Sequence, residues 1–101
     1  MEQINDLILK ADKIANSDSW FNRENNRREA IVLYNQALNL ILISREYLLA
    51  ANVALKISEL FEILDNKIIA NDYYKKAGTY FHKGNDYEKS VEIFNKLILK
   101  L

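Results

Sequence analysis

The stretch from Ala30 to Ala50 reads AIVLYNQALNLILISREYLLA, and forty residues later the stretch from Ala70 to Ser90 reads ANDYYKKAGTYFHKGNDYEKS. The matching pairs are Ala30 and Ala70, Tyr34 and Tyr74, Ala37 and Ala77, Ser44 and Gly84, Glu46 and Asp86, Tyr47 and Tyr87, and Ala50 and Ser90. The pairs keep helical spacing, and the turn of one stretch matches the turn of the other. Each unit is therefore expected to be a helix, a tight turn and a second helix.

The apolar periodicity outside these stretches extends the helical interpretation to the whole chain. Helices are predicted over 3–15, 25–43 and 45–64, with a fourth that ends near Lys83 and a fifth that reaches the C-terminus. Asp65 or Asn66 is expected to cap the fourth helix. Gly84 is expected to adopt the left-handed conformation that closes it. Asn85 would then cap the fifth, with Glu88 in the position of a capping box.

Small residues at three-and-four spacing let two helix axes approach closely, and a tyrosine fills the groove beside them. A single helical hairpin cannot bury its apolar face alone, so the hairpins should stack. We therefore predict an all-α, tetratricopeptide-like (TPR-like) right-handed stack of antiparallel helical hairpins with about five helices. It forms one domain over 1–101, made of a helix at 3–15, an aromatic loop at 16–24, and repeats at 25–64 and 65–101.

The composition and net charge of the chain argue against several classes of partner and site. The chain has 101 residues, and its 14 Lys and Arg balance its 14 Asp and Glu. This balance argues against nucleic acid as the partner, because neutralising phosphates needs a basic surplus. There is no cysteine, and no apolar run approaches the ~20 residues that span a bilayer. We expect a cytoplasmic protein, peripheral at membranes at most.

No catalytic or metal-binding constellation can be assembled, so the sequence predicts neither an enzyme nor a cofactor. His82 is the single histidine, and the chain has no cysteine that could complete a metal site with it. Glu59 and Glu62 share a helix face as carboxylates of a two-metal site do, but the accompanying Glu-x-x-His pattern is missing. A solvated face is the better interpretation of this pair.

Four segments resemble, in order and spacing, the N-terminal TPR-like region of the soluble NSF attachment protein (alpha-SNAP-like) family. They are KADKIANSDSWF at 10–21, Glu29-Ala30 with Tyr34 and Ala37, KAGTYFHK at 76–83, and DYEKS at 86–90. The resemblance implies an adaptor of vesicle trafficking and membrane fusion that binds SNARE helices. It also implies that the aromatic loop touches the membrane.

That loop carries the first candidate site. Trp20 and Phe21 would contact the membrane, and Arg23, Arg27 and Arg28 would meet anionic headgroups. The alternative is that the aromatic pair folds back and fixes the first helix on the second, as a hydrophobic staple does.

Two further sets of residues, four tyrosines and four lysines, are interpreted mainly as structural. Tyr34, Tyr47, Tyr74 and Tyr87 hold equivalent places in the repeat, which favours packing over a peptide-binding groove. Lys75, Lys76, Lys83 and Lys89 could contact acidic surfaces of SNARE bundles. Acidic residues are interleaved among these lysines, so a solvated face is preferred.

The last helix is apolar on more than one side, as an internal helix of a stack is. Val91, Phe94, Ile98 and Leu101 form one stripe, and Ile93, Leu97 and Leu99 make the other sides apolar. Ile93, Leu97, Leu99 and Leu101 are therefore candidate protein-interface residues, with a homo-oligomer as one outcome. The leading hypothesis is a non-catalytic SNAP-like adaptor. The alternative is a self-associating helical repeat protein used as a scaffold.

Overall fold

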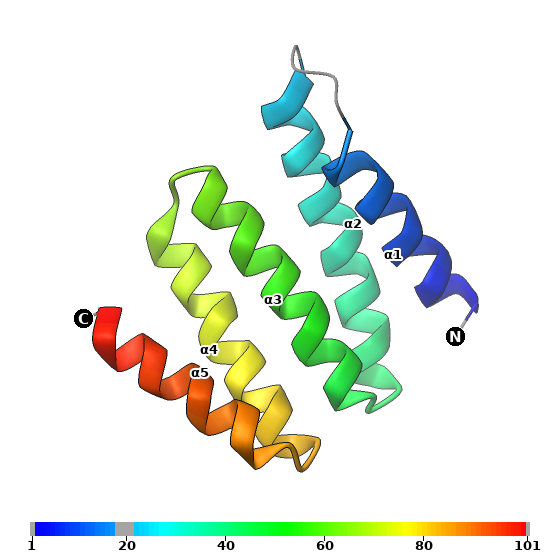
Figure 1. Ribbon diagram of the computed structural model, residues 1–101. Helices are drawn as coiled ribbons and strands as arrows, with labels where there is room; N and C mark the ends of the chain where they lie inside the picture. The colour runs from blue at the N-terminus through cyan, green and yellow to red at the C-terminus, as the bar shows by residue number, and fades with distance from the viewer. Residues whose placement is uncertain (1, 18–21, 101) are drawn as a thin grey trace.

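The computed structural model describes residues 2–17 and 22–100, and every regular element in this part of the chain is a helix. The helices are α1 (Glu2–Ala15), α2 (Arg23–Ile43), α3 (Tyr47–Ile63), α4 (Lys67–Lys83) and α5 (Tyr87–Lys100). The predicted fold class is confirmed. The chain is an all-α, TPR-like stack of antiparallel helical hairpins (Figure 1).

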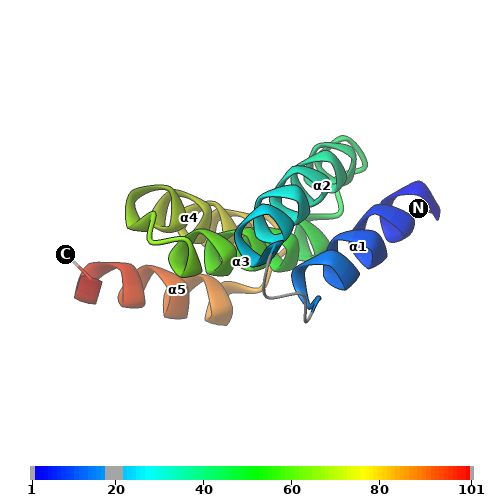
Figure 2. The ribbon, with the colours of Figure 1, turned by 90° about the horizontal axis from the view of Figure 1, so that it is seen from above.

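Each helix packs against its neighbours in the sequence, and the contacts are most extensive within the pairs α1–α2 and α3–α4. The chain therefore zigzags between two layers, with α2 and α4 in one and α1, α3 and α5 in the other (Figure 2). The result is a slab of 39 × 35 × 16 Å. The layer of α1, α3 and α5 presents three helices to one side, and this side carries the cavities described below.

Small residues stand where the helices cross. The five alanines that are fully buried at repeat positions are Ala30, Ala37, Ala50, Ala70 and Ala77. Tyr34 is only 3% exposed and fills the space beside them. The methyl groups let the axes approach, as the spacing predicts.

The three turns between α2 and α5 are copies of one another at intervals of twenty residues. Arg45, Asp65 and Asn85 have positive φ values of 58°, 60° and 68°. In each turn the following amide donates to a carbonyl near the helix end, for example Glu46 N to Ile41 O at 3.2 Å. This six-to-one hydrogen bond is the Schellman pattern. The forty-residue repeat is thus two helix-and-turn units of equal length.

Two predictions at the α4–α5 turn were wrong. Gly84 has an ordinary φ of −87°, and Asn85 is the left-handed residue. Gly84 is needed for a different reason, because a Cβ there would lie 2.7 Å from Leu48 Cδ2. Asp86 rather than Asn85 caps α5, since its Oδ1 accepts from Lys89 N at 3.2 Å. At the preceding turn Asn66 caps α4 by accepting from Ile69 N at 3.3 Å.

None of the described helices is long and apolar enough to cross a membrane.

Candidate protein-binding surface

The largest cavity described on the protein, of about 430 Å³, opens between α1 and α3 with α2 at its floor. Its lining includes Asp12, Ala15, Arg27, Tyr34, Lys56 and Glu59. The lining therefore combines two cations with two carboxylates around a tyrosine. Such a mixture suits recognition of a polar peptide better than enclosure of an apolar ligand.

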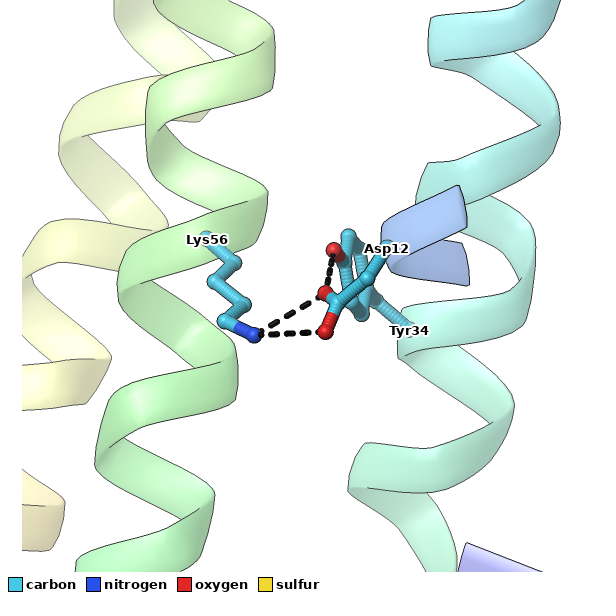
Figure 3. Close-up of polar contacts among 3 residues, drawn as sticks. All are labelled: Asp12, Tyr34 and Lys56. Carbon is cyan, nitrogen blue, oxygen red and sulfur yellow. Dashed lines mark hydrogen bonds and ion pairs between the residues drawn. The ribbon is translucent and has the colours of Figure 1, made fainter. Parts of the chain in front are cut away.

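Asp12 of α1 is the centre of a polar cluster in this cavity (Figure 3). Tyr34 of α2 donates its hydroxyl hydrogen to Asp12 Oδ1, and Lys56 Nζ of α3 lies 2.9 Å from Oδ1 and 3.2 Å from Oδ2. Lys56 Nζ also lies 5.7 Å from the centroid of the Tyr34 ring. One carboxylate therefore joins three helices through charge-assisted contacts.

These contacts set the protonation of both acids. Burial raises the pKa of Asp12, but the hydrogen bonds from Tyr34 and Lys56 and the charge of Lys56 outweigh it, so this pKa lies below its ordinary value. Burial, and then the hydrogen bond to Asp12 and its charge, raise the pKa of the Tyr34 phenol. At neutral pH Asp12 is therefore an acceptor and Tyr34 a donor, as their hydrogen bond requires.

A second cavity, of about 340 Å³, repeats the first one helical hairpin further along. Four pairs of lining residues, with one member in each cavity, are forty positions apart. They are Asp12 and Asn52, Ala15 and Leu55, Tyr34 and Tyr74, and Lys56 and Lys96. Both cavities therefore open on the side of α1, α3 and α5. The forty-residue repeat therefore reproduces a cavity lining as well as a helical hairpin.

A third cavity, of about 380 Å³, lies along α3 and α4 and connects the other two. It shares Glu59 and Ile63 with the first cavity, and Leu55 and Tyr74 with the second. The three cavities are thus one continuous surface, which we call the odd-helix groove.

The residues predicted to touch a membrane are only partly described. Trp20 and Phe21 lie outside the described residues. Arg28 pairs with Glu24 at 2.9 Å on the exposed side of α2. Arg27 is half-buried in the first cavity, and it also lines, with Arg23, a smaller cavity of about 200 Å³. Arg23 and Arg27 therefore share a cavity, whereas Arg28 is held in an ion pair on the exposed side of the helix.

The predicted interface residues of α5 fall into different environments. Ile93 is 5% exposed and belongs to the core between α3 and α4, and Leu97 packs against the same cluster. Leu99 is 86% exposed, and Leu101 lies outside the described residues. The apolar residues that do face outward on α5 include Val91 and Ile98, at 58% and 65% exposure.

The tyrosines at repeat positions lie in different environments, which depend on the helix that carries them. Tyr34 and Tyr74 lie at the floor of the first two cavities. Tyr87 hydrogen-bonds Asn85 at 2.9 Å and meets the edge of the His82 ring, with centroids 5.0 Å apart. Tyr47 lies beneath Lys83, whose Nζ is 5.6 Å from the ring centroid.

Three of the four lysines predicted to form a solvated face, Lys76, Lys83 and Lys89, lie over aromatic rings. Lys76 Nζ lies 4.5 Å from the Tyr73 ring centroid, and Lys89 Nζ lies 5.4 Å from that of Phe81. These distances are typical of cation–π contacts. Among the described residues, no group of three or more His, Asp or Glu side chains is placed to hold a metal ion.

Asp12, Lys56 and Lys96 were not singled out from the sequence. The sequence does contain a pattern that could have pointed to these residues. The forty-residue shift continues into α1, where it relates Asp12 to Asn52, and it also relates Lys56 to Lys96. These pairs differ in residue type or lie on exposed helix faces, so they do not stand out in an apolar pattern.

Comparison with known proteins identifies a family. A family model described as "Uncharacterized protein conserved in bacteria (DUF2225)" matches residues 1–99. The chain belongs to the DUF2225 family. No curated protein matches it, and no solved structure does.

Membership of the DUF2225 family corrects the predicted resemblance. The assignment to the alpha-SNAP-like family was wrong, because that family serves vesicle trafficking in eukaryotes and DUF2225 is conserved in bacteria. The expected roles in SNARE binding, vesicle transport and membrane fusion are overturned with it. The segments that suggested the resemblance are those of small-residue helical packing, which unrelated helical repeats share.

Proposed function

We propose that this DUF2225 chain is a non-catalytic protein-binding module that accepts an extended segment of a partner protein in the odd-helix groove. The observation that carries the proposal is the repetition of one cavity lining at four positions. A groove of repeated subsites matches a ligand that itself repeats, and a polypeptide in extended conformation does so. The balanced charge of the chain supports a protein partner over nucleic acid. The lack of cysteine supports action in the cytoplasm.

A peptide selection tests this function. Random peptides displayed on phage are selected against the wild-type protein, and the bound peptides are measured by fluorescence anisotropy. The groove is then filled with Asn52→Trp and Glu59→Trp, at two exposed positions that line it. We expect binding to weaken at least about tenfold, which is ~1.4 kcal/mol.

The matched control places the same bulk elsewhere. Gln36→Trp lies on an exposed position of α2 and should leave the affinity unchanged. Circular dichroism checks that all variants keep their helices. Selection of no peptide, or equal loss with Gln36→Trp, would contradict the proposal.

Self-association through α5 is the second candidate function. Val91, Phe94 and Ile98 are the forty-residue counterparts of Ala51, Ala54 and Ser58, which α3 buries beneath α4. The exposed face of α5 is therefore the face on which the preceding hairpin carries a helix. A second copy of the chain could supply that helix in a weak dimer.

Light scattering after size exclusion tests this second candidate. Ile98→Glu should shift any dimer to monomer, because it introduces a charge into the apolar face. Asn95→Glu, on an exposed position of the same helix, should have a smaller effect. Leu97 is unsuited to this test since it packs in the core cluster. A monomeric wild type at high concentration contradicts self-association.

A further inference from the structure

The two related cavities differ at the position of the acid. In the first, the Asp12 carboxylate accepts from Tyr34 and pairs with Lys56. In the second, Asn52 stands at the equivalent position, and its neutral amide cannot supply a carboxylate. The first cavity therefore carries a carboxylate at a position where the second carries a neutral amide.

The charges of the two linings follow this difference. Arg27 and Lys56 face Asp12 and Glu59 in the first cavity, so its formal charges balance. In the second cavity Lys89 and Lys96 face only Glu92. One carboxylate from outside would give the second lining the balance that the first has within the chain.

The cations of the second cavity are accessible to such a group. Lys96 pairs with Glu92 at 3.3 Å, but the two side chains are 56% and 59% exposed. Exposed pairs one helical turn apart are weak and exchange partners readily. Lys89 lies over the Phe81 ring at the cavity wall, which keeps its ammonium group beside the space without neutralising it.

We propose that the cavity between α3, α4 and α5 binds a carboxylate of an acidic side chain of the partner, at the position that Asp12 occupies in the first cavity. The identity of the ligand as a partner side chain rests on the proposed protein-binding function. The carboxylate chemistry rests on the comparison of the two cavities alone. Within the partner segment, an Asp or Glu is thus the residue that the second cavity selects.

A small-molecule titration tests the carboxylate site. N-acetylglutamate amide, which carries one carboxylate, and N-acetylglutamine amide, its neutral counterpart, are titrated into labelled protein at constant ionic strength. Two-dimensional NMR follows the Asn52 amide and the Lys89 and Lys96 backbone signals. We expect saturable shifts with the glutamate derivative and none with the glutamine derivative.

Two substitutions define the site. Asn52→Asp gives the second cavity its own carboxylate and should weaken binding about fivefold, and Lys96→Gln should weaken it similarly. Asp12→Asn removes the carboxylate of the first cavity and should create a second set of shifts around Lys56. Lys75→Gln, on an exposed position of α4 that lines neither cavity, is the charge-matched control and should change nothing.

The outcomes separate this inference from the proposed function. Equal shifts with both derivatives, with inorganic phosphate, or in the Asn52→Asp variant overturn the carboxylate site. Selected peptides that bind the groove but show no enrichment of Asp or Glu also overturn it, while the protein-binding function stands. If the glutamate derivative binds as expected but no peptide is selected, the carboxylate site stands and the function as a peptide-binding module falls.

Discussion

Lys56 Nζ of α3 lies 2.9 Å from Asp12 Oδ1 of α1, so an ion pair joins two helices that both pack against α2. Tyr34 of α2 donates to the same carboxylate from beneath. The three residues come from three successive helices and are separated by 22 positions at each step. This cluster therefore fixes how the first hairpin meets the second, and it lies within the groove proposed to bind a partner.

Acidification should reduce the contribution of Asp12 to the free energy of unfolding. Its pKa in the folded protein lies below the ordinary value of 3.8, so the unfolded chain binds the proton more readily. The stabilisation is complete above that ordinary value and is lost as the pH falls through the lower, folded pKa. Urea unfolding of wild type and Asp12→Asn across this range should give a difference that shrinks with acid. A difference independent of pH contradicts the role assigned to the carboxylate.

Tyr34 and Lys56, the two partners of Asp12, should contribute unequally to the free energy of unfolding. Tyr34 is 3% exposed, and Tyr34→Phe leaves Asp12 without its buried donor, at a cost of about 1–2 kcal/mol in the free energy of unfolding. The Lys56 and Asp12 side chains are 42% and 33% exposed, so Lys56→Met should cost less than about 1 kcal/mol. Chemical denaturation measures both variants. A larger loss for Lys56→Met would reverse the ranking and refute it.

Arg45→Gly should stabilise the protein. Arg45 holds a left-handed φ of 58° at the α2–α3 turn, a conformation that costs a residue with a Cβ about 1–2 kcal/mol. Glycine removes that cost but adds freedom to the unfolded chain, so we expect a net gain of about 0.5–1 kcal/mol. Thermal and urea unfolding measure the gain.

Arg28→Gly is the control for this substitution. Arg28 lies within α2 and pairs with Glu24, so glycine there should destabilise by about 1 kcal/mol. The substitution of arginine by glycine is thus expected to stabilise the protein at Arg45 and to destabilise it at Arg28. Loss of stability at both positions would show that the turn carries no strain at Arg45.

Gly78→Ala should destabilise the protein although alanine favours helices. A Cβ at Gly78 would lie 3.0 Å from Ile93 Cγ2 and 3.0 Å from the ring of Phe94. Ile93 is buried and has little room to move, so crowding should exceed the ~1 kcal/mol that helix propensity offers. The change in unfolding free energy is the measurement.

A second substitution tests whether crowding is the cause. Phe94→Leu removes the ring that faces Gly78 and should relieve the effect of Gly78→Ala in the double variant. A double-mutant cycle gives the coupling between the two positions. Additive effects would mean that Phe94 does not limit the approach of α5 to α4.

The sequence alone determined the helical class and the forty-residue repeat. Both depend on local patterns, since apolar spacing specifies a helix face and buried alanines such as Ala37 and Ala77 specify close crossings. It also located the turns. It assigned the left-handed position to Gly84 instead of Asn85, because glycine is the usual residue there and the contact of Gly84 with Leu48 is not visible in the chain order.

Only the tertiary structure decided which polar residues meet. Asp12 and Lys56 stand 44 positions apart on different helices, and no spacing rule brings them together until both helices are packed on α2. The same holds for Ile93, whose burial against α4 depends on how α5 is turned in the stack. A helical pattern specifies which side of a helix is apolar. Packing decides what that side faces, because the contact depends on the rotation and crossing of two helices at once.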